Sequence, residues 1–276
     1  MLAFTSRRSL RTALISALVA AALGAPVSAA PPNTVYLALG DSLAWGDGAS
    51  DPSETAYVPL LADYFAGTPH GGAKQLSNLA VRGETTASFI AGGQLSAAIA
   101  AISDPATDIR VVTLALGGND LLDLLNDASD PCRTNPASLE CQALVAAALA
   151  GVANRYPIIL GGLIGALAGD PGEERIYVMT VYNAFGGTES QFELPVDFVL
   201  LGADLTIDCT ALGNPANAGL NDVIGCTSLL AGATVVDAYP VIGDNALALT
   251  HIGEPVFNIH PNDGGYALLA KAHRKA

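Results

Sequence analysis

Positively charged residues are scarce in this sequence, which has 12 Lys and Arg against 26 Asp and Glu and a net charge of −14. Such a surface repels phosphates, so DNA, RNA and anionic lipid headgroups are not expected as partners. Metal-binding patterns are missing as well, because there is no C-x-x-C and the four histidines never form H-E-x-x-H. We therefore expect no metal and no other cofactor.

Internal repeats and heptad runs are also absent, which excludes solenoids and coiled coils. Aromatic residues make up only 6% of the chain, whereas 51% of it is hydrophobic and glycine occurs 29 times. A chain of this size and composition can bury a sizeable core. We expect one α/β domain over residues 31–276.

The first thirty residues have the pattern of a secretory signal peptide. A basic start is followed by the apolar run Ala13–Leu23 and by small residues suited to cleavage at Val27-Ser28-Ala29. The alternative is an uncleaved anchor, but the apolar run is short for a membrane span. Removing residues 1–30 takes away Arg7, Arg8 and Arg11 and no acidic residue, so the net charge falls from −14 to −17. Secretion is expected; Ser6-Arg7-Arg8 resembles part of a twin-arginine signal but leaves the route open.

Four cysteines remain after this segment: Cys132, Cys141, Cys209 and Cys226. An even number of cysteines in an exported chain predicts two disulfides. Three pairings are possible, and we favour the sequential one, Cys132–Cys141 with Cys209–Cys226, because both bonds then close local loops.

Short apolar runs alternate with longer helical stretches along the chain. Five runs are almost continuously apolar, as parallel strands covered on both faces are: Val35–Leu39, Leu76–Val81, Val111–Leu116, Ile176–Val181 and Thr234–Ala238. The predicted helices are Ala56–Phe65, Ser88–Ile102, Leu139–Ala153, Ile158–Ala168, Asn217–Leu230 and Gly265–His273. This alternation predicts a three-layer α/β/α sandwich, doubly wound around a flavodoxin-like, five-stranded parallel sheet.

Two stretches between these elements need separate comment. Ala143–Ala168 is apolar enough to suggest a membrane span, but Asn154-Arg155-Tyr156-Pro157 interrupts it, so we expect two core helices. Asn183–Asn214 has no strong periodicity. It is expected to form a long loop that could roof the site.

Polar residues gather where the predicted strands end, and ligands bind at that edge of a parallel sheet. Ser42 follows the first strand in Gly-Asp-Ser, Gly83 follows the second, and Asn119 follows the third in Gly-Gly-Asn-Asp. His260 lies in His-Pro-Asn before the last helix. Taken singly, each motif could be structural, since Asp and Ser cap helices and glycine turns are common.

Together, in order and spacing, these motifs resemble the four sequence blocks of the SGNH (GDSL-type) hydrolases from Val35 to Ala270. The resemblance implies that Ser42 is a nucleophile and His260 its general base. It further implies an oxyanion hole formed by the N–H groups of Ser42 and Gly83 and the side-chain amide of Asn119. No G-x-S-x-G occurs, so the nucleophile elbow of α/β-hydrolases is excluded.

The sequence departs from this family at one position. The family usually has an Asp three residues before the His, where this chain has Phe257. Asp237, Glu254 and Asn258 are the alternative third members, with Asp263 also nearby. A neutral amide or a backbone carbonyl can orient an imidazole, so we favour a dyad.

The expected function is a secreted, monomeric serine esterase or lipase that hydrolyses carboxylic esters through an acyl-enzyme. A small-molecule or lipid ester is the expected partner, without stable membrane insertion. Acetyl esterase activity on polysaccharide and phospholipase activity are alternatives at the same site. A binding protein with a degenerate site is the alternative of another class. Trp45 and Phe257 could line an acyl pocket or belong to the core.

Overall fold

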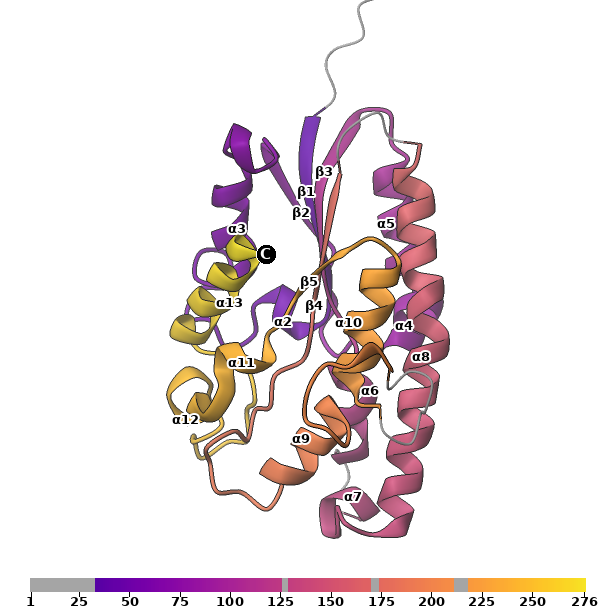
Figure 1. Ribbon diagram of the computed structural model, residues 1–276. Coiled ribbons are helices and arrows are strands. Elements are labelled where there is room, and N and C mark those ends of the chain that lie inside the picture. The colour runs from indigo at the N-terminus through magenta and orange to yellow at the C-terminus, as the bar shows by residue number, and fades with distance from the viewer. Residues whose placement is uncertain (1–32, 126–128, 170–173, 211–217) are drawn as a thin grey trace, which may run out of the picture. The chain divides into compact units, whose positions relative to one another are not determined.

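The fold is built on five parallel strands in the order β2-β1-β3-β4-β5. A computed structural model describes residues 33–125, 129–169, 174–210 and 218–276 of the chain, and the predicted signal peptide at 1–30 lies outside them (Figure 1). The strands are β1 (Asn33–Gly40), β2 (Gln75–Asn78), β3 (Thr107–Ala115), β4 (Arg175–Met179) and β5 (Thr234–Val236). All five expected strands are present, within a few residues at their ends.

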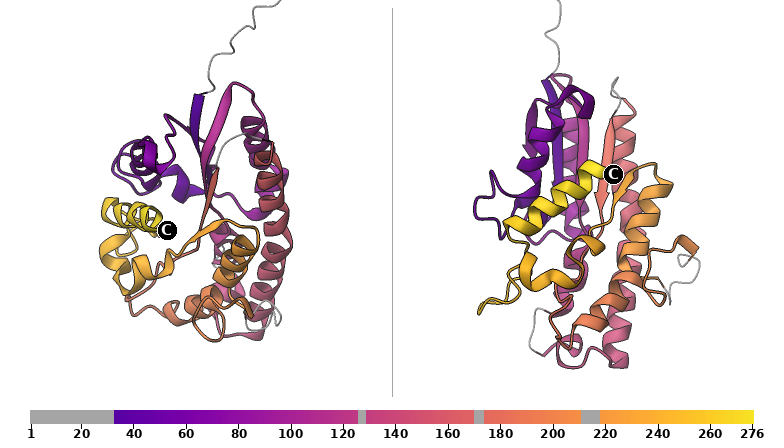
Figure 2. Two further views of the ribbon diagram at one scale, coloured as in Figure 1. Left: turned by 45° about the horizontal axis from the view of Figure 1, so that its top comes forward. Right: turned by 60° about the vertical axis from the view of Figure 1, so that its left-hand side comes forward.

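Helices cover both faces of this sheet, because alternate residues of the central strands β1, β3 and β4 bury apolar side chains on opposite sides. Val35, Leu37 and Leu39 face one core, whereas Tyr36 and Ala38 face the other. The first core is closed by α4 (Thr86–Ala91), α5 (Gln94–Ile102), α8 (Leu139–Leu167) and α10 (Leu220–Leu230), and the second by α3 (Tyr57–Phe65), α11 (Tyr239–Ile242) and α13 (Asp263–Lys275). Figures 1 and 2 show the two helical layers on either side of the sheet. The predicted three-layer α/β/α fold is therefore confirmed.

Shorter helices follow the carboxyl ends of the strands. They are α2 (Ser42–Trp45), α6 (Gly118–Leu122), α7 (Pro131–Thr134), α9 (Glu193–Leu201) and α12 (Ala246–Leu249). The prediction of an unstructured loop over Asn183–Asn214 was wrong in part, because α9 lies within it. Residues 211–217 lie outside the described residues, and they include the end of that predicted loop and the first residue of the helix predicted over Asn217–Leu230.

Two helix boundaries also differ from the prediction. The helix expected over Ser88–Ile102 is divided into α4 and α5, since Gly93 adopts a φ of +100° that L-residues disfavour. Conversely, the two helices expected around Pro157 form the single helix α8. The proline costs one backbone hydrogen bond, but the buried side chains on both sides of it, among them Val152, Tyr156 and Ile159, keep the helix on the core.

Helix α8 is long and apolar enough to cross a membrane by length and composition. Its second half instead belongs to the core of the domain, where Leu160, Leu163 and Leu167 are buried. The first half extends beyond the sheet, and Leu139 and Leu144 there are exposed.

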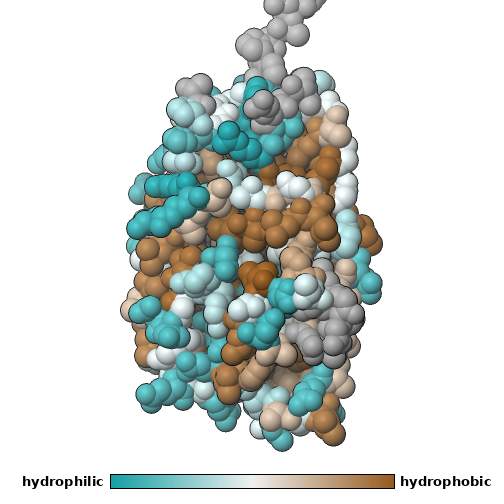
Figure 3. Space-filling model, in the orientation of Figure 1, coloured by the Kyte–Doolittle hydropathy of each residue, from teal (hydrophilic) through white to brown (hydrophobic). Residues whose placement is uncertain are grey.

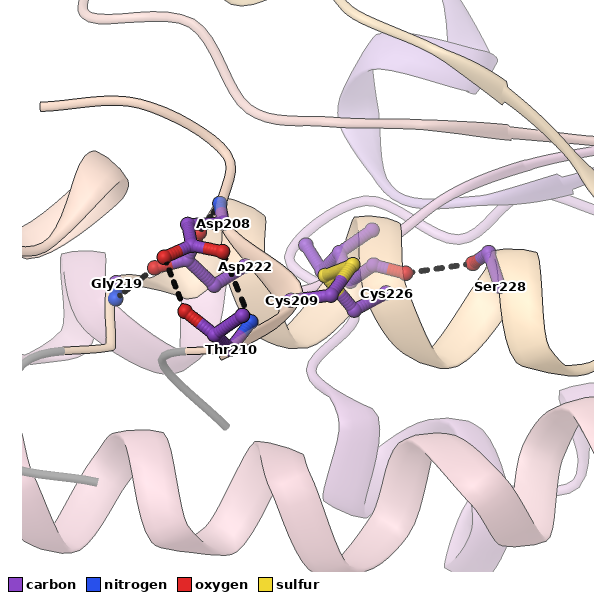
Figure 4. The surroundings of a disulfide bond; sticks show 8 residues. Asp208, Cys209, Thr210, Gly219, Asp222, Cys226 and Ser228 are labelled. Atoms are coloured by element: carbon purple, nitrogen blue, oxygen red, sulfur yellow. Dashed lines mark hydrogen bonds between the residues drawn. A yellow bond between two sulfur atoms is a disulfide. The ribbon is translucent and has the colours of Figure 1, made fainter. Parts of the chain in front are cut away.

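Two disulfides pair the cysteines sequentially, as expected: Cys132–Cys141 and Cys209–Cys226. The first joins α7 to the start of α8. The second joins the segment after α9 to α10, where the carboxylate of Asp222 accepts hydrogen bonds from the N–H groups of Asp208 and Gly219 (Figure 4).

Candidate active site

Ser42 stands at the carboxyl end of β1, as the first residue of α2. Gly40 allows the preceding turn, because a Cβ at this residue would lie 2.0 Å from the carbonyl oxygen of Ala115 on β3. Asp41 then caps α2 by accepting a hydrogen bond from the N–H of Leu43 at 2.9 Å. Burial raises the pKa of this carboxyl to about 7, although the hydrogen bond from Leu43 opposes the rise.

The hydroxyl of Ser42 is hydrogen-bonded to His260, with 2.8 Å between Oγ and Nε2. These residues are 218 positions apart in the sequence. The loop that carries His260 is anchored on both sides, by a bond from the Tyr182 hydroxyl to the carbonyl of Ile259 and by one from the His251 N–H to the carbonyl of His260. A serine bonded to an unprotonated imidazole nitrogen can give up its proton and act as a nucleophile.

Asn258 orients this imidazole, because its Oδ1 lies 2.8 Å from Nδ1 of His260. The same oxygen accepts the backbone N–H of His260 at 3.0 Å. Turning the amide over would place its NH₂ against that N–H, so the backbone fixes Oδ1 toward the ring. An acceptor at Nδ1 keeps the proton there and leaves Nε2 free to take the proton of Ser42.

The charge state of His260 favours the same role. Burial lowers the pKa of its imidazole below the usual value, while the negative charge of Asp47 acts in the opposite direction. A lowered pKa keeps the ring neutral at pH 7, and only a neutral ring can accept a proton.

Two of the three residues expected to supply oxyanion donors, Ser42 and Asn119, line one cavity, and Gly83 lies in the loop after β2 beside Glu84. Neither the N–H of Ser42 nor that of Gly83 has an acceptor among the residues that the structure describes. Gly83 has a φ of +73°, and a Cβ there would meet nothing within 4 Å, so the left-handed backbone rather than packing favours glycine. The amide of Asn119 donates to the carbonyl of Glu84 at 3.0 Å and lies 3.4 Å from Oδ2 of Asp41.

A buried polar network supports these donors, and no sequence motif indicated it. Gln94, at the start of α5, accepts from the N–H of Gly40 at 2.7 Å and donates to its carbonyl at 3.0 Å. Its amide also donates to the carboxylate of Glu84 at 2.7 Å. Gln94 thus links the turn before Ser42 to the loop that carries Gly83. A single glutamine on an alanine-rich helix was the only available signal.

Asp120, the last residue of the Gly-Gly-Asn-Asp motif, could have capped the helix that follows the motif. In the structure its side chain has other partners. Its carboxylate accepts from the N–H of Thr86 at 2.8 Å and from the guanidinium of Arg155 at 2.9 Å. Arg155 additionally donates to the Thr86 hydroxyl at 2.7 Å. These bonds connect α4, α6 and α8 directly beside Asn119.

The other two candidates for a third member have different partners. Asp237 accepts from the Thr180 hydroxyl at 2.9 Å and from the N–H of Tyr239 at 3.2 Å. Glu254 lies 2.6 Å from Nδ1 of His251. Of the three, the structure therefore brings Asn258 against His260.

A cavity of about 660 Å³ opens beside Ser42 and His260. Its wall is almost entirely apolar and comes from β4, α6, α7, α8 and α9. Representative lining residues are Leu121, Leu125, Val145, Leu149, Phe192 and Phe198. None of these residues belongs to a sequence motif, so the cavity could not be predicted from one.

The expectation that Trp45 and Phe257 line an acyl pocket or belong to the core was wrong. Trp45 is 45% exposed and Phe257 is 66% exposed, and neither contributes to the cavity wall. Trp45 instead stacks under the guanidinium of Arg82 at 5.2 Å. Within the described part of the chain, no group of three or more His, Cys, Asp and Glu is placed to hold a metal ion.

Comparison with solved structures supports the fold. The chain is similar to an extracellular lipase from Streptomyces rimosus, with 22% identity, a TM-score of 0.57, and coverage of 88% of this chain and 99% of that one. It is also similar to phospholipase A1 from Streptomyces albidoflavus (19% identity, TM-score 0.56, 87% and 98% covered). A mutant of an acetyl-xylooligosaccharide esterase from Geobacillus aligns less well (15% identity, TM-score 0.50, 89% and 94% covered).

No functionally curated protein sequence matches this chain. The sequence model of the GDSL-like lipase/acylhydrolase family, however, matches residues 38–268, which is most of the chain and includes Ser42, Gly83, Asn119 and His260. With the parallel sheet and the motifs at its carboxyl edge, this match shows that the chain belongs to the GDSL-like lipase/acylhydrolase family.

Proposed function

We propose that this protein is a secreted, monomeric serine hydrolase that cleaves carboxylic esters of long acyl chains. The observation that carries the proposal is the Ser42–His260 pair, with 2.8 Å between Oγ and Nε2, in the wall of an apolar cavity of about 660 Å³. The two disulfides support an oxidising compartment, as does the predicted signal peptide at 1–30.

In the proposed reaction, Ser42 attacks the ester carbonyl while Nε2 of His260 removes its proton. The N–H groups of Ser42 and Gly83 and the amide of Asn119 then stabilise the alkoxide of the tetrahedral intermediate. His260 returns the proton to the leaving alcohol, which leaves the acyl group on Ser42. Water, activated by the same imidazole, releases the acid. Asn258 holds Nδ1–H throughout.

The size and chemistry of the cavity favour a long acyl chain. A methylene group occupies about the volume of a water molecule, roughly 30 Å³, so the cavity has room for on the order of 20 such groups. Burying each methylene contributes about 0.8 kcal/mol, or roughly a threefold to fourfold gain in kcat/KM. An acetyl group would leave most of this apolar space unfilled, which disfavours the acetyl esterase alternative.

A panel of p-nitrophenyl esters from acetate to stearate tests the substrate class, together with acetylated xylan and phosphatidylcholine. We expect kcat/KM to rise with chain length well beyond butyrate. A maximum at acetate, or preference for acetylated xylan, would reject the long-chain assignment.

A labelled fluorophosphonate tests the chemistry separately, because it reacts only with an activated serine. We expect labelling of the unaltered protein, none of Ser42→Ala, and normal labelling of Ser96→Ala, which changes an exposed serine on α5. Ser42→Ala should lower hydrolysis by about 10⁴-fold or more without a change in Tm. An unlabelled but folded protein would favour the binding-protein alternative instead.

A further inference from the structure

Four large apolar side chains are exposed on the two segments that follow β4 and precede His260. Leu194 and Phe198 on α9 are 56% and 47% exposed, and Val256 and Phe257 on the loop before His260 are 77% and 66% exposed. We call these four residues the mouth face. Scattered apolar residues are normal on a protein surface, but a group beside a binding site marks an interaction surface.

The mouth face is continuous with the cavity. The ring of Phe257 stacks on that of Phe185 with 6.3 Å between centroids, and Phe185 packs on Phe192 at 5.4 Å. Phe185 and Phe192 both line the cavity, as do Leu194 and Phe198. Two aromatic contacts therefore link the exposed ring of Phe257 to the wall of the cavity that Ser42 also lines.

The charges around the mouth face limit what it can contact. From Ile176 to Ala270 the sequence contains no lysine or arginine and ten acidic residues. Glu193 and Asp197 lie on α9 itself, whereas Glu254, two residues before Val256, is paired with His251. Figure 3 shows apolar atoms interspersed with hydrophilic ones over one side of the protein. Such a region repels an anionic lipid surface but attracts cations, and aromatic rings beside carboxylates favour quaternary ammonium groups.

From these observations we propose that the mouth face docks on the surface of phosphatidylcholine aggregates. Val256, Phe257, Phe198 and Leu194 would enter the interfacial layer, and the outward choline groups would lie near Glu193. Docking in this orientation places the cavity opening against the lipid, so that an acyl chain passes from one apolar medium to another. The choice of a lipid as occupant rests on the proposed function, whereas binding itself does not require hydrolysis.

The test measures vesicle binding without catalysis. Exported protein carrying Ser42→Ala is mixed with large unilamellar vesicles of dioleoylphosphatidylcholine, and the bound fraction is measured by sedimentation. In this background the double variant Val256→Asn, Phe257→Gln should lower the partition coefficient at least about tenfold, since two large apolar side chains no longer enter the lipid.

The matched control is Leu229→Asn, Leu230→Gln. These residues are 57% and 84% exposed but lie at the end of α10 that precedes β5, at the opposite edge of the sheet from Ser42. The control should bind as the parent does. With Ser42 restored, both double variants should hydrolyse a soluble short-chain ester within twofold of the parent, because Val256 and Phe257 do not line the cavity. Hydrolysis of vesicle lipid should fall only for the mouth-face variant.

Three results would overturn the proposal. The first is equal partitioning of the two double variants. The second is stronger binding when phosphatidylglycerol is added to the vesicles, which would contradict the charge argument. The third is a dimer in size-exclusion chromatography that the mouth-face variant converts to a monomer, because a second copy would then cover this surface. If no ester at all is hydrolysed, the proposed function fails, while the binding result with Ser42→Ala still decides the docking.

Discussion

Asn258 gives the sharpest test of the proposed site, because a neutral side chain occupies the role usually taken by a carboxylate. Asn258→Leu keeps the size of the side chain but removes the acceptor 2.8 Å from Nδ1 of His260. The imidazole becomes positively charged during the reaction, and a hydrogen bond to a charged group contributes about 1.5–3 kcal/mol. We therefore expect kcat to fall by roughly 10- to 150-fold, at about 1.4 kcal/mol per tenfold. In a serine-protease triad the loss on replacing Asp by Asn is larger, about 10⁴-fold, because the tautomer is then wrong.

Asn258→Asp should act in the opposite direction. A carboxylate in contact with an imidazolium raises the imidazole pKa by about 1–3 units. In the unaltered protein, burial lowers the pKa of His260 below 6.5, so kcat/KM should rise with pH and reach its plateau near or below neutrality. In Asn258→Asp the acid limb should move upward by at least about one unit, and the plateau kcat should equal or exceed that of the parent because a charge-assisted hydrogen bond is stronger.

The assay is the pH dependence of kcat and kcat/KM with a soluble p-nitrophenyl ester, from about pH 5 to 9. Glu254→Gln and Asp237→Asn serve as controls, since their carboxylates bond to His251, Thr180 and the Tyr239 N–H instead. Each should cost less than about tenfold. Full activity in Asn258→Leu would refute the orienting role. A thousandfold loss in either control, with the fold intact, would identify a carboxylate as the third member.

Other consequences can be tested on individual residues. Asn119→Ala should lower kcat by roughly 10²–10³ with little change in KM, because its amide acts on the developing oxyanion; a change in KM alone would show a role in substrate binding. Replacing Cys209 and Cys226 by serine should lower the free energy of unfolding by about 2–4 kcal/mol in urea melts, and an unchanged midpoint would contradict the estimate. Buried His273 has a pKa lowered by burial to about 4, so the unfolded state takes up its proton first as pH falls from 6.5. The free energy of unfolding should therefore fall between pH 6.5 and pH 4, by up to about 3 kcal/mol. His273→Phe should remove most of this difference in urea melts compared at pH 7 and 4.5.

The parts of the site that the sequence predicts are those whose chemistry depends on residue type. Ser42, Gly83, Asn119 and His260 each follow or precede a predicted element, and the sheet then brings them to one edge. From the sequence, Asn258 is only one of several candidates for orienting His260. Which side chain bonds to Nδ1 depends on the path of the loop that carries the histidine. The cavity could not be predicted, since Leu, Val and Phe on a cavity wall have the same pattern as those in a core.

Each error in the predicted secondary structure has a local physical cause. Residues Glu193–Leu201 form a helix whose apolar side chains face the cavity and the solvent, so its pattern lacks a single buried stripe. The apolar spacing runs on from α4 into α5 and so predicted one helix, but Gly92-Gly93 separates the two. At Pro157 the opposite happened, because tertiary packing outweighed one missing hydrogen bond. The positions of the central strands were predicted more accurately, since apolar runs covered on both faces leave little alternative, whereas β2 is largely exposed although its sequence is partly apolar.

The disulfide between Cys132 and Cys141 determines when the wall of the cavity is complete. Both half-cystines belong to the cavity wall, and the bond joins α7 to the first half of α8, which extends beyond the sheet. The sheet lies between the two main cores, and the strands, Ser42 and His260 all lie outside the loop of residues 132–141 that this disulfide closes. In a reducing cytosol the chain would therefore bring its reactive groups together while the acyl-binding wall lacked its covalent link. For a protein that is exported and cleaves lipids as proposed, oxidation after export would complete that wall and would delay full lipid cleavage until the protein has left the cell that makes it.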